Sequence, residues 1–467
     1  MSSGGKSLRF RVLRSAKWTL LGHGASQVLR SGSNLILTRL LAPDMFGVMA
    51  LGYMMFTGLT MLSDLATADI VTRSPRGDEP LFLNVVWVIQ FVRGIFIALC
   101  ALGVSALLAS DIVGGLIPKS SVYGDPRIPL LVAVLAITPL IEGFESTKSY
   151  LARRHLNIAL VTKLELICQF ATTVFILTWA AFQPSVWALA AGWIFSCTLK
   201  TVLSHAVLPG PSNRLQWDSK AFWEAFHFGK WALISSPVSF MLVSGDRLLL
   251  NGLLDATMMG FYSIAFLLTT ALQTAINKVV YFSVLPALSE VNRDRPAEMR
   301  ETIYRIRRPL DMACIVPAGA LLVLGSTIVN LLYDPRYAAA GWMLSVVGLT
   351  LALVQFNVFD QVLIATARIK VLTMLNAMRL TLLYAVVWAG FHFFGPRGAV
   401  IGVPLAGLIS AGVLLCVHGR LGFLDLRREL LAIPLFAGGA AIGWLLKLPL
   451  DAVLAHLPHG TLLHRHL

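Results

Sequence analysis

Charged side chains inside long apolar stretches are the residues of this 467-residue chain best placed to do chemistry. The basic candidates are Arg30, Arg93, Arg247 and Arg379, and the acidic ones are Asp246 and Asp360. A guanidinium group can bind two oxygens of a phosphate or pyrophosphate at once. A carboxylate at membrane depth can hold a proton or a sodium ion. The alternative is structural: each arginine reaches the nearer membrane interface or pairs with an acid.

Two of these arginines lie in a sequence repeat. The run from Lys17 to Gly47 matches the run from Lys230 to Gly260 without a gap, at an offset of 213, with 13 identities in 31 positions. Arg247 corresponds to position 34, four residues (about one helical turn) beyond Arg30. We therefore expect the two guanidinium groups to occupy similar faces of two equivalent helices and to contribute to a wet, electropositive central chamber for an anion.

The composition predicts a polytopic membrane protein built only from helices. The chain is 57% hydrophobic and 13% charged, and its apolar runs repeatedly reach the ~20 residues that cross a bilayer. We predict about thirteen spans, at 18–39, 45–65, 81–109, 128–146, 158–181, 186–207, 230–251, 260–285, 310–333, 340–366, 371–394, 398–418 and 431–449. The tail at 450–467 is either a truncated further helix or a surface segment.

The repeat divides the chain into two related halves. We predict an N-terminal six-helix lobe at 1–210, a C-terminal six-helix lobe at 211–420, and an extra span with a tail at 421–467. Because six is even, both lobes have the same orientation, which is typical of a parallel-repeat transporter. A second echo supports the repeat: Asp125-Pro126-Arg127 and Asp334-Pro335-Arg336 each precede an even-numbered span.

The distribution of basic residues gives the orientation. With the N-terminus in the cytoplasm, 23 of the 38 Lys and Arg lie in cytoplasmic segments and 6 lie on the opposite side. This asymmetry accounts for most of the net charge of +14, so no nucleic-acid partner is needed. The polar interval 289–308 is expected to form an amphipathic helix on the cytoplasmic surface, with its basic residues near anionic headgroups.

Enzyme and metal motifs are missing from the sequence. It contains no Walker A loop, no GxSxG and no HExxH, and it has no long polar loop for a catalytic domain. The five cysteines stand singly in apolar segments, which indicates neither a disulfide framework nor a metal site. We expect a transporter without catalytic residues, metal or cofactor.

Several runs resemble a known family. They are LTRLLAPDMFGVMAL (37–51), LSDL (62–65), SGDRLLLNGLLDATMMGFYSIAF (244–266), LPALSE (285–290) and NLLYDPRYAAAGWML (330–344). Over about residues 15–420 the chain resembles the bacterial Wzx-type polysaccharide or oligosaccharide flippases of the multidrug/oligosaccharidyl-lipid/polysaccharide (MOP) exporter superfamily. Of the candidate residues, only Asp246 and Arg247 lie in a matching run.

The resemblance implies a flippase of the bacterial inner membrane. It implies alternating access and a polyprenyl-pyrophosphate-linked glycan as substrate, moved for exopolysaccharide, capsule or O-antigen synthesis. Membrane lipid, a polysaccharide polymerase and glycosyltransferases are the implied partners. Independently of the resemblance, coupling to protons or sodium would act through Asp246 and Asp360, and the membrane potential would act on the anionic charge that is moved. Three alternatives stay open: a cation-coupled multidrug exporter of the same superfamily, an integral membrane glycan polymerase or transferase, and a scaffold that transports nothing.

Overall fold

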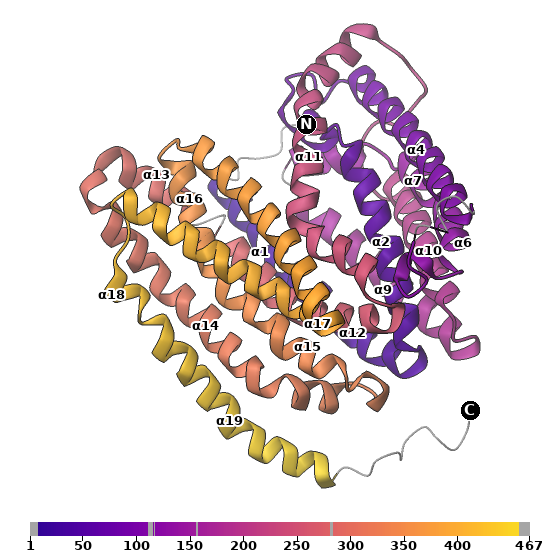
Figure 1. Ribbon diagram of the computed structural model, residues 1–467. Helices are drawn as coiled ribbons and strands as arrows, with labels where there is room; N and C mark the ends of the chain where they lie inside the picture. Colours follow the sequence, from indigo (N-terminus) through magenta and orange to yellow (C-terminus); the bar gives the residue numbers. More distant parts are fainter. Residues whose placement is uncertain (1–7, 111–114, 116, 156, 281–283, 457–467) are drawn as a thin grey trace. The chain divides into compact units, whose positions relative to one another are not determined.

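A computed structural model describes the chain except residues 1–7, 111–114, 116, 156, 281–283 and 457–467. Within the described residues every regular element is a helix (Figure 1). The chain forms two compact units, Met1–Val243 and Ser244–Leu467, and the boundary lies inside the helix α11. The sequence repeat places the division at 210/211 instead, and the predicted three-part organisation stays a prediction.

The first unit contains the helices up to the greater part of α11. Their bounds are α1 Leu8–Leu40, α2 Pro43–Leu62, α3 Thr67–Arg73, α4 Pro80–Ala109, η1 Val122–Gly124, α6 Ile128–Leu135, α7 Ile137–Gly143, α8 Lys148–Arg154, α9 Ile158–Phe182, α10 Val186–Ala206 and α11 Ser219–Leu253. Proline at the first helical position starts α2 and α4, where its missing N–H has no intrahelical partner to lose. The ends of α4, α9 and α10 lie within one residue of the predicted spans, whereas α1 and α11 begin ten and eleven residues before the starts predicted at 18 and 230.

The second unit holds the remaining helices. They are α12 Ala256–Val279, α13 Leu285–Asp294, η3 Pro296–Glu298, α14 Met299–Leu332, η4 Pro335–Tyr337, α15 Ala340–Val347, η5 Gly348–Phe356, α16 Asn357–Ala365, α17 Ile369–Arg420, α18 Leu426–Glu429 and α19 Ala432–His456. The Asp255 carboxylate accepts a hydrogen bond from the Met258 N–H (2.7 Å) and so caps the start of α12. The predicted tail at 450–467 belongs to α19 as far as His456; its remainder lies outside the described residues.

Nine described helices are long and apolar enough to cross a membrane, or ten if the bent segment formed by α6, α7 and α8 is one span. The 52-residue α17 contains the two spans predicted at 371–394 and 398–418. Gly395 separates them with φ 64° and ψ −154°, a conformation that favours glycine, and Pro396 follows it. The helices α1 and α11, with 33 and 35 residues, are also long enough to cross a membrane.

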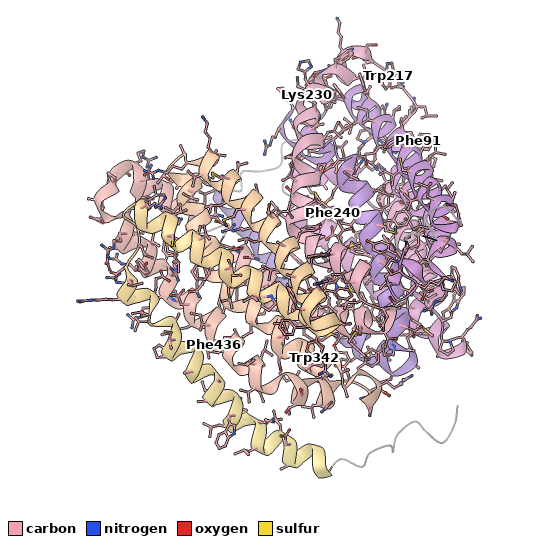
Figure 2. All side chains as sticks on the ribbon, in the orientation of Figure 1. Phe91, Trp217, Lys230, Phe240, Trp342 and Phe436 are labelled. Atoms are coloured by element: carbon pink, nitrogen blue, oxygen red, sulfur yellow. The ribbon has the colours of Figure 1, made fainter. Side chains whose placement is uncertain are left out.

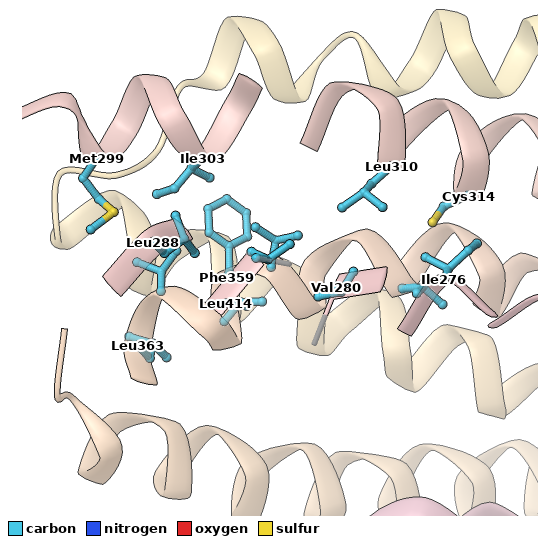
Figure 3. Packing of buried hydrophobic residues seen from close by; sticks show 14 of the residues in the cluster. Ile276, Val280, Leu288, Met299, Ile303, Leu310, Cys314, Phe359, Leu363 and Leu414 are labelled. Carbon is cyan, nitrogen blue, oxygen red and sulfur yellow. The ribbon is translucent and has the colours of Figure 1, made fainter. Parts of the chain in front are cut away.

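Apolar side chains hold each unit together. In the first unit, Phe82 and Val86 of α4 pack with Val71 of α3 and Ala221 of α11. In the second, one cluster joins α12, α13, α14, α16 and α17 through residues such as Leu288, Ile303, Phe359 and Leu414 (Figure 3). Figure 2 draws the side chains on the ribbon, and many of the large apolar side chains are exposed, as expected of helices that face lipid.

The Asp-Pro-Arg echo has the same local geometry in both units. In the first, Asp125 Oδ1 accepts hydrogen bonds from the Arg127 N–H (2.9 Å) and Nε (3.0 Å). In the second, Asp334 Oδ1 accepts from the Arg336 N–H (2.9 Å) and Nε (2.9 Å). Matching side-chain bonds before corresponding helices support a common origin for the two halves.

The prediction for the interval 289–308 needs correction. Residues 299–308 form the first turns of α14 and continue directly into its apolar part, so they are not a separate surface helix. Arg307, expected near lipid headgroups, is 1% exposed. Its charge is balanced inside the protein by Glu429, whose carboxylate lies 2.5 Å away. The amphipathic pattern is real, but its basic residues do not all face the membrane surface.

Candidate functional site

Arg247 lies on α11 in the second unit, and it forms no ion pair with an acid among the residues that the structure describes. Its Nη2 donates to the Ser244 hydroxyl (2.9 Å), and its guanidinium carbon lies 4.4 Å from the centre of the Phe266 ring on α12. Its Nε is buried and makes no hydrogen bond within the described part of the chain. A cation–π contact stabilises the charge but leaves N–H donors free. Arg247 can therefore accept an anion without first releasing an acid.

The neighbouring Asp246 has a different partner. Its Oδ2 accepts a 2.6 Å hydrogen bond from the Tyr262 hydroxyl of α12, and Tyr262 is fully buried. Tyr384 of α17 packs against Gly245 on the same helix turn, with a ring carbon 3.3 Å from where a Gly245 Cβ would lie. The Tyr384 hydroxyl is buried without a hydrogen-bond partner among the described residues. Ionisable and hydroxyl groups from α11, α12 and α17 thus surround this turn.

Arg379 and Asp360 form one ion pair. Arg379 on α17 donates from Nη1 (2.8 Å) and Nη2 (2.9 Å) to the two carboxylate oxygens of Asp360 on α16, and also from Nη1 to Asn376 (3.1 Å). The sequence analysis assigned these residues to different roles, substrate binding and ion coupling. In this structure each neutralises the other, which is the structural alternative considered for Arg379.

Arg93 is held at the end of α2 in the first unit. Its Nη2 donates to the Thr60 carbonyl oxygen (2.7 Å) and its Nε to the Ser63 hydroxyl (3.2 Å). Asp64 lies farther away, with 3.8 Å between the nearest nitrogen and oxygen. Arg93 therefore links α4 to the C-terminal end of α2 through two of its five N–H donors.

Arg30 lies on α1 and is exposed. Its guanidinium makes neither an ion pair nor a hydrogen bond with any residue that the structure describes; its carbonyl oxygen accepts from Ser33 (2.9 Å). The adjacent helix contact is formed by Ser26, which donates to Gln169 of α9 (2.5 Å). Of the four predicted arginines, Arg379 is paired with Asp360 and Arg93 lies 3.8 Å from Asp64, whereas Arg30 and Arg247 form no ion pair among the described residues. The predicted central chamber stays a prediction.

Other ionisable residues at depth have structural partners. Lys200 pairs with Glu145 (2.9 Å), and Glu165 pairs with Arg153 (3.2 Å). The Lys163 ammonium lies 5.3 Å from the centre of the Trp18 ring. No group of three or more potential metal ligands occurs within the described residues.

Sequence reasoning missed two features of the second unit. The first is the pair Tyr262 and Phe266, which face Asp246 and Arg247; their spacing of four places both rings on one face of α12, a pattern that was available. The second is the buried group around Arg307, formed with Glu429 and Gln355. Arg307 and Glu429 are separated by 122 positions, so no local pattern joins them.

Two helical units with charged side chains inside apolar helices define a multi-pass membrane protein. The chain belongs to the polysaccharide biosynthesis protein family, whose profile matches residues 36–341. It is 20% identical over 418 residues to the lipopolysaccharide biosynthesis protein WzxC of Escherichia coli K12, covering 86% of this chain and 80% of that protein. The teichuronic acid biosynthesis protein TuaB of Bacillus subtilis is 21% identical over 53% of this chain.

Solved structures show the same fold. The lipid II flippase MurJ in an inward closed conformation aligns with a TM-score of 0.68 at 11% identity, covering 94% of this chain and 98% of that one. An inward-facing multidrug resistance MATE transporter of the MOP superfamily aligns with a TM-score of 0.63 at 14% identity, covering 88% and 95%. The all-helical fold and the resemblance to Wzx-type proteins of the MOP superfamily are confirmed.

Proposed function

We propose that this protein is a flippase that moves a polyprenyl-pyrophosphate-linked oligosaccharide across the bacterial inner membrane, for the synthesis of an exopolysaccharide, capsule or O-antigen. The observation that carries the proposal is Arg247, an arginine inside an apolar helix that has free donors and no acid partner in the described part of the chain. An unneutralised cation at membrane depth is costly, so its retention points to an anionic substrate. The family membership supports a role in polysaccharide synthesis.

Arginine suits the pyrophosphate chemically. Its planar fork donates two parallel hydrogen bonds to phosphoryl oxygens and replaces the water that the anion loses on entering the protein. Arg30 and Arg247 bind first in this proposal, because neither has to leave an acid. Arg93 and Arg379 join when substrate oxygens replace Ser63 and Asp360 as their partners.

Transport proceeds by alternating access in this proposal. The glycan and pyrophosphate pass through the protein while the polyprenyl tail stays in lipid. With the cytoplasm negative, the membrane potential favours outward passage of an anion by about 2.3 kcal/mol per charge per 100 mV. Asp246 and Asp360 are the proposed sites for a coupling proton or sodium ion; binding at Asp360 would release Arg379 to the substrate.

The proposal includes the orientation and the partners of the protein. The N-terminus is cytoplasmic, glycosyltransferases supply the lipid-linked glycan on that side, and a polysaccharide polymerase uses it on the other. Neither an enzyme activity nor a nucleic-acid partner is part of the function. The unpaired arginines favour this substrate over the cationic drugs of a multidrug exporter, which would be repelled by them.

The experiment that tests the function is deletion of the gene followed by lipid analysis of both leaflets. We expect lipid-linked glycan to accumulate in the cytoplasmic leaflet and surface polysaccharide to be lost, with both reversed by the wild-type gene. Unchanged glycan lipids combined with altered drug resistance would instead support the multidrug exporter. Loss of the lipid-linked glycan itself, without accumulation, would indicate a transferase.

A further inference from the structure

Two adjacent residues of opposite charge, Asp246 and Arg247, bind to different side chains of one helix face. Tyr262 and Phe266 are four residues apart on α12, so their rings point the same way, and their centres lie 6.2 Å apart. The Tyr262 hydroxyl donates a hydrogen bond to the Asp246 carboxylate, and the Phe266 ring makes a cation–π contact with the Arg247 guanidinium. Consecutive side chains on α11 point about 100° apart, and each of these two contacts a different side chain of α12.

The other acid–arginine combinations in the described residues behave differently. Arg379 is neutralised by Asp360 through two short hydrogen bonds, and Arg93 lies 3.8 Å from Asp64. Asp246 and Arg247 form no such pair where the structure describes them. Neighbouring residues can nevertheless pair, as Arg293 and Asp294 do at the end of α13 (2.9 Å). The Asp246 carboxylate is instead held by its 2.6 Å bond to a fully buried phenol.

We propose that Tyr262 is a positioning residue for anion binding: it holds the Asp246 carboxylate and so keeps the Arg247 donors free for the oxygens of a pyrophosphate. The inference rests on the proposed function and specifies how its site stays ready. Without the phenol, the carboxylate would lose the hydrogen bond that the structure describes, and the guanidinium on the next residue, Arg247, would be a charged donor for it. The arginine would then be engaged, as Arg379 is with Asp360.

Phe266 has the complementary role. Its ring face attracts the guanidinium without using any N–H group, so the charge is held in place and its donors stay available. Ser244 takes one of them at Nη2 (2.9 Å) and fixes the orientation. One turn of α12 therefore presents a hydrogen-bond donor to Asp246 and an aromatic ring to Arg247. These two contacts keep the carboxylate and the guanidinium apart.

The test measures binding of farnesyl diphosphate to the full-length protein in detergent, with farnesol as the uncharged control ligand. Tyr262→Phe is expected to weaken binding about tenfold, because a freed carboxylate competes with the diphosphate for Arg247. Adding Asp246→Asn to this variant is expected to restore affinity to within about twofold, because the competitor is gone. Asp246→Asn alone should bind at least as tightly as wild type. Tyr333→Phe, which alters another buried tyrosine of the same unit, serves as the matched control and should change nothing.

Each outcome decides one question. Wild-type affinity of Tyr262→Phe, or a loss that Asp246→Asn does not reverse, overturns the positioning role. Weaker binding by Asp246→Asn alone overturns it too, and this measurement stands even if Tyr262→Phe fails to fold. If the wild-type protein ignores farnesyl diphosphate, or if Arg247→Ala binds it normally, the proposed function fails at this site and takes the inference with it.

Discussion

Arginine residues in this protein differ in what surrounds them, and that difference separates candidate binding residues from structural ones. The sequence identified Arg30, Arg93, Arg247 and Arg379 by their position inside apolar runs. The sequence could not distinguish the arginines without an acid partner from the paired ones, because pairing depends on contacts between helices. Arg379 finds Asp360 on another helix, whereas Arg247 meets an aromatic ring. A single sequence shows which residues are charged but not which side chains contact them.

Replacing the free arginines should impair export. We expect Arg30→Ala and Arg247→Ala each to lower surface polysaccharide by about tenfold or more at normal protein levels, since each removes charge-assisted bonds to the pyrophosphate. Arg30→Lys and Arg247→Lys should keep part of the activity, because the charge remains but the fork is lost. Quantifying surface polysaccharide against membrane protein content gives the answer. Full export by both alanine variants would exclude a binding role for these residues.

A second prediction concerns Arg307, the buried arginine that the sequence placed at the surface. Its guanidinium bonds Glu429 and Gln355 and lies 4.8 Å from the centre of the Phe359 ring. Arg307→Ala leaves the Glu429 carboxylate buried without its partner, at a cost of about 3–5 kcal/mol. Arg308→Ala changes the next residue, which is exposed, and is the matched control. Thermal unfolding in detergent should show a large loss for the first variant alone; equal stabilities would contradict the buried pair.

Helices are the elements that the sequence predicted best. The spans predicted at 81–109 and 158–181 correspond to α4 at Pro80–Ala109 and α9 at Ile158–Phe182, because long apolar runs and proline mark such ends. The span predicted at 340–366 is broken in three, with the nine-residue 3-10 helix η5 between α15 and α16. Its apolar sequence is compatible with an ordinary helix, so the change comes from packing and could not be predicted. Long 3-10 segments often mark hinges.

The contact between α14 and α19 gives a prediction at this scale. A Cβ added at Gly439 would lie 2.3 Å from the Val316 carbonyl oxygen, so the two backbones touch there, whereas a Cβ at Gly438 would meet nothing within 4 Å. Gly439→Val should therefore destabilise the protein by about 1–3 kcal/mol through overpacking, and Gly438→Val should have little effect. Unfolding temperatures of the two variants test the packing. Similar losses for both would show that α19 does not lie against α14 as described (Figure 1).

The Asp-Pro-Arg turn of the first unit should respond to acid. Burial favours the neutral carboxyl of Asp125, but the hydrogen bonds from Arg127 outweigh it and lower the pKa of Asp125 below its ordinary 3.8. A lowered pKa contributes stability above the ordinary value, and this contribution is lost as the pH falls below 3.8 through the folded-state value.

Asp125→Asn should therefore unfold at a lower temperature than wild type at pH 7, by about 2 °C, and the gap should close as the pH falls toward 3. Melting curves of both proteins across this range measure it. A gap that persists unchanged at pH 3 would mean that the carboxylate charge is not what stabilises the turn.

At the scale of the whole molecule, the sequence repeat and the composition predicted the class of protein. The 213-residue offset, the matching Asp-Pro-Arg turns and the apolar runs were all readable from one sequence, and the fold shared with MurJ and a MATE transporter agrees with them. The predicted boundary between the halves at 210/211 stays a prediction, while the compact units divide at 243/244. The division between the compact units lies inside the helix α11, so no loop in the sequence indicates it.

The central claim is that unpaired arginines move a pyrophosphate-linked lipid across the membrane, and a flipping assay tests it directly. The protein is reconstituted into liposomes with a fluorescent polyprenyl-pyrophosphate-linked oligosaccharide, and the fraction of label protected from an external quencher is followed over time. We predict rapid flipping by the wild-type protein and by Arg308→Ala, and a rate at least about tenfold lower for Arg247→Ala. Equal rates for wild type and Arg247→Ala, or no flipping by the wild-type protein above empty liposomes, would contradict the account.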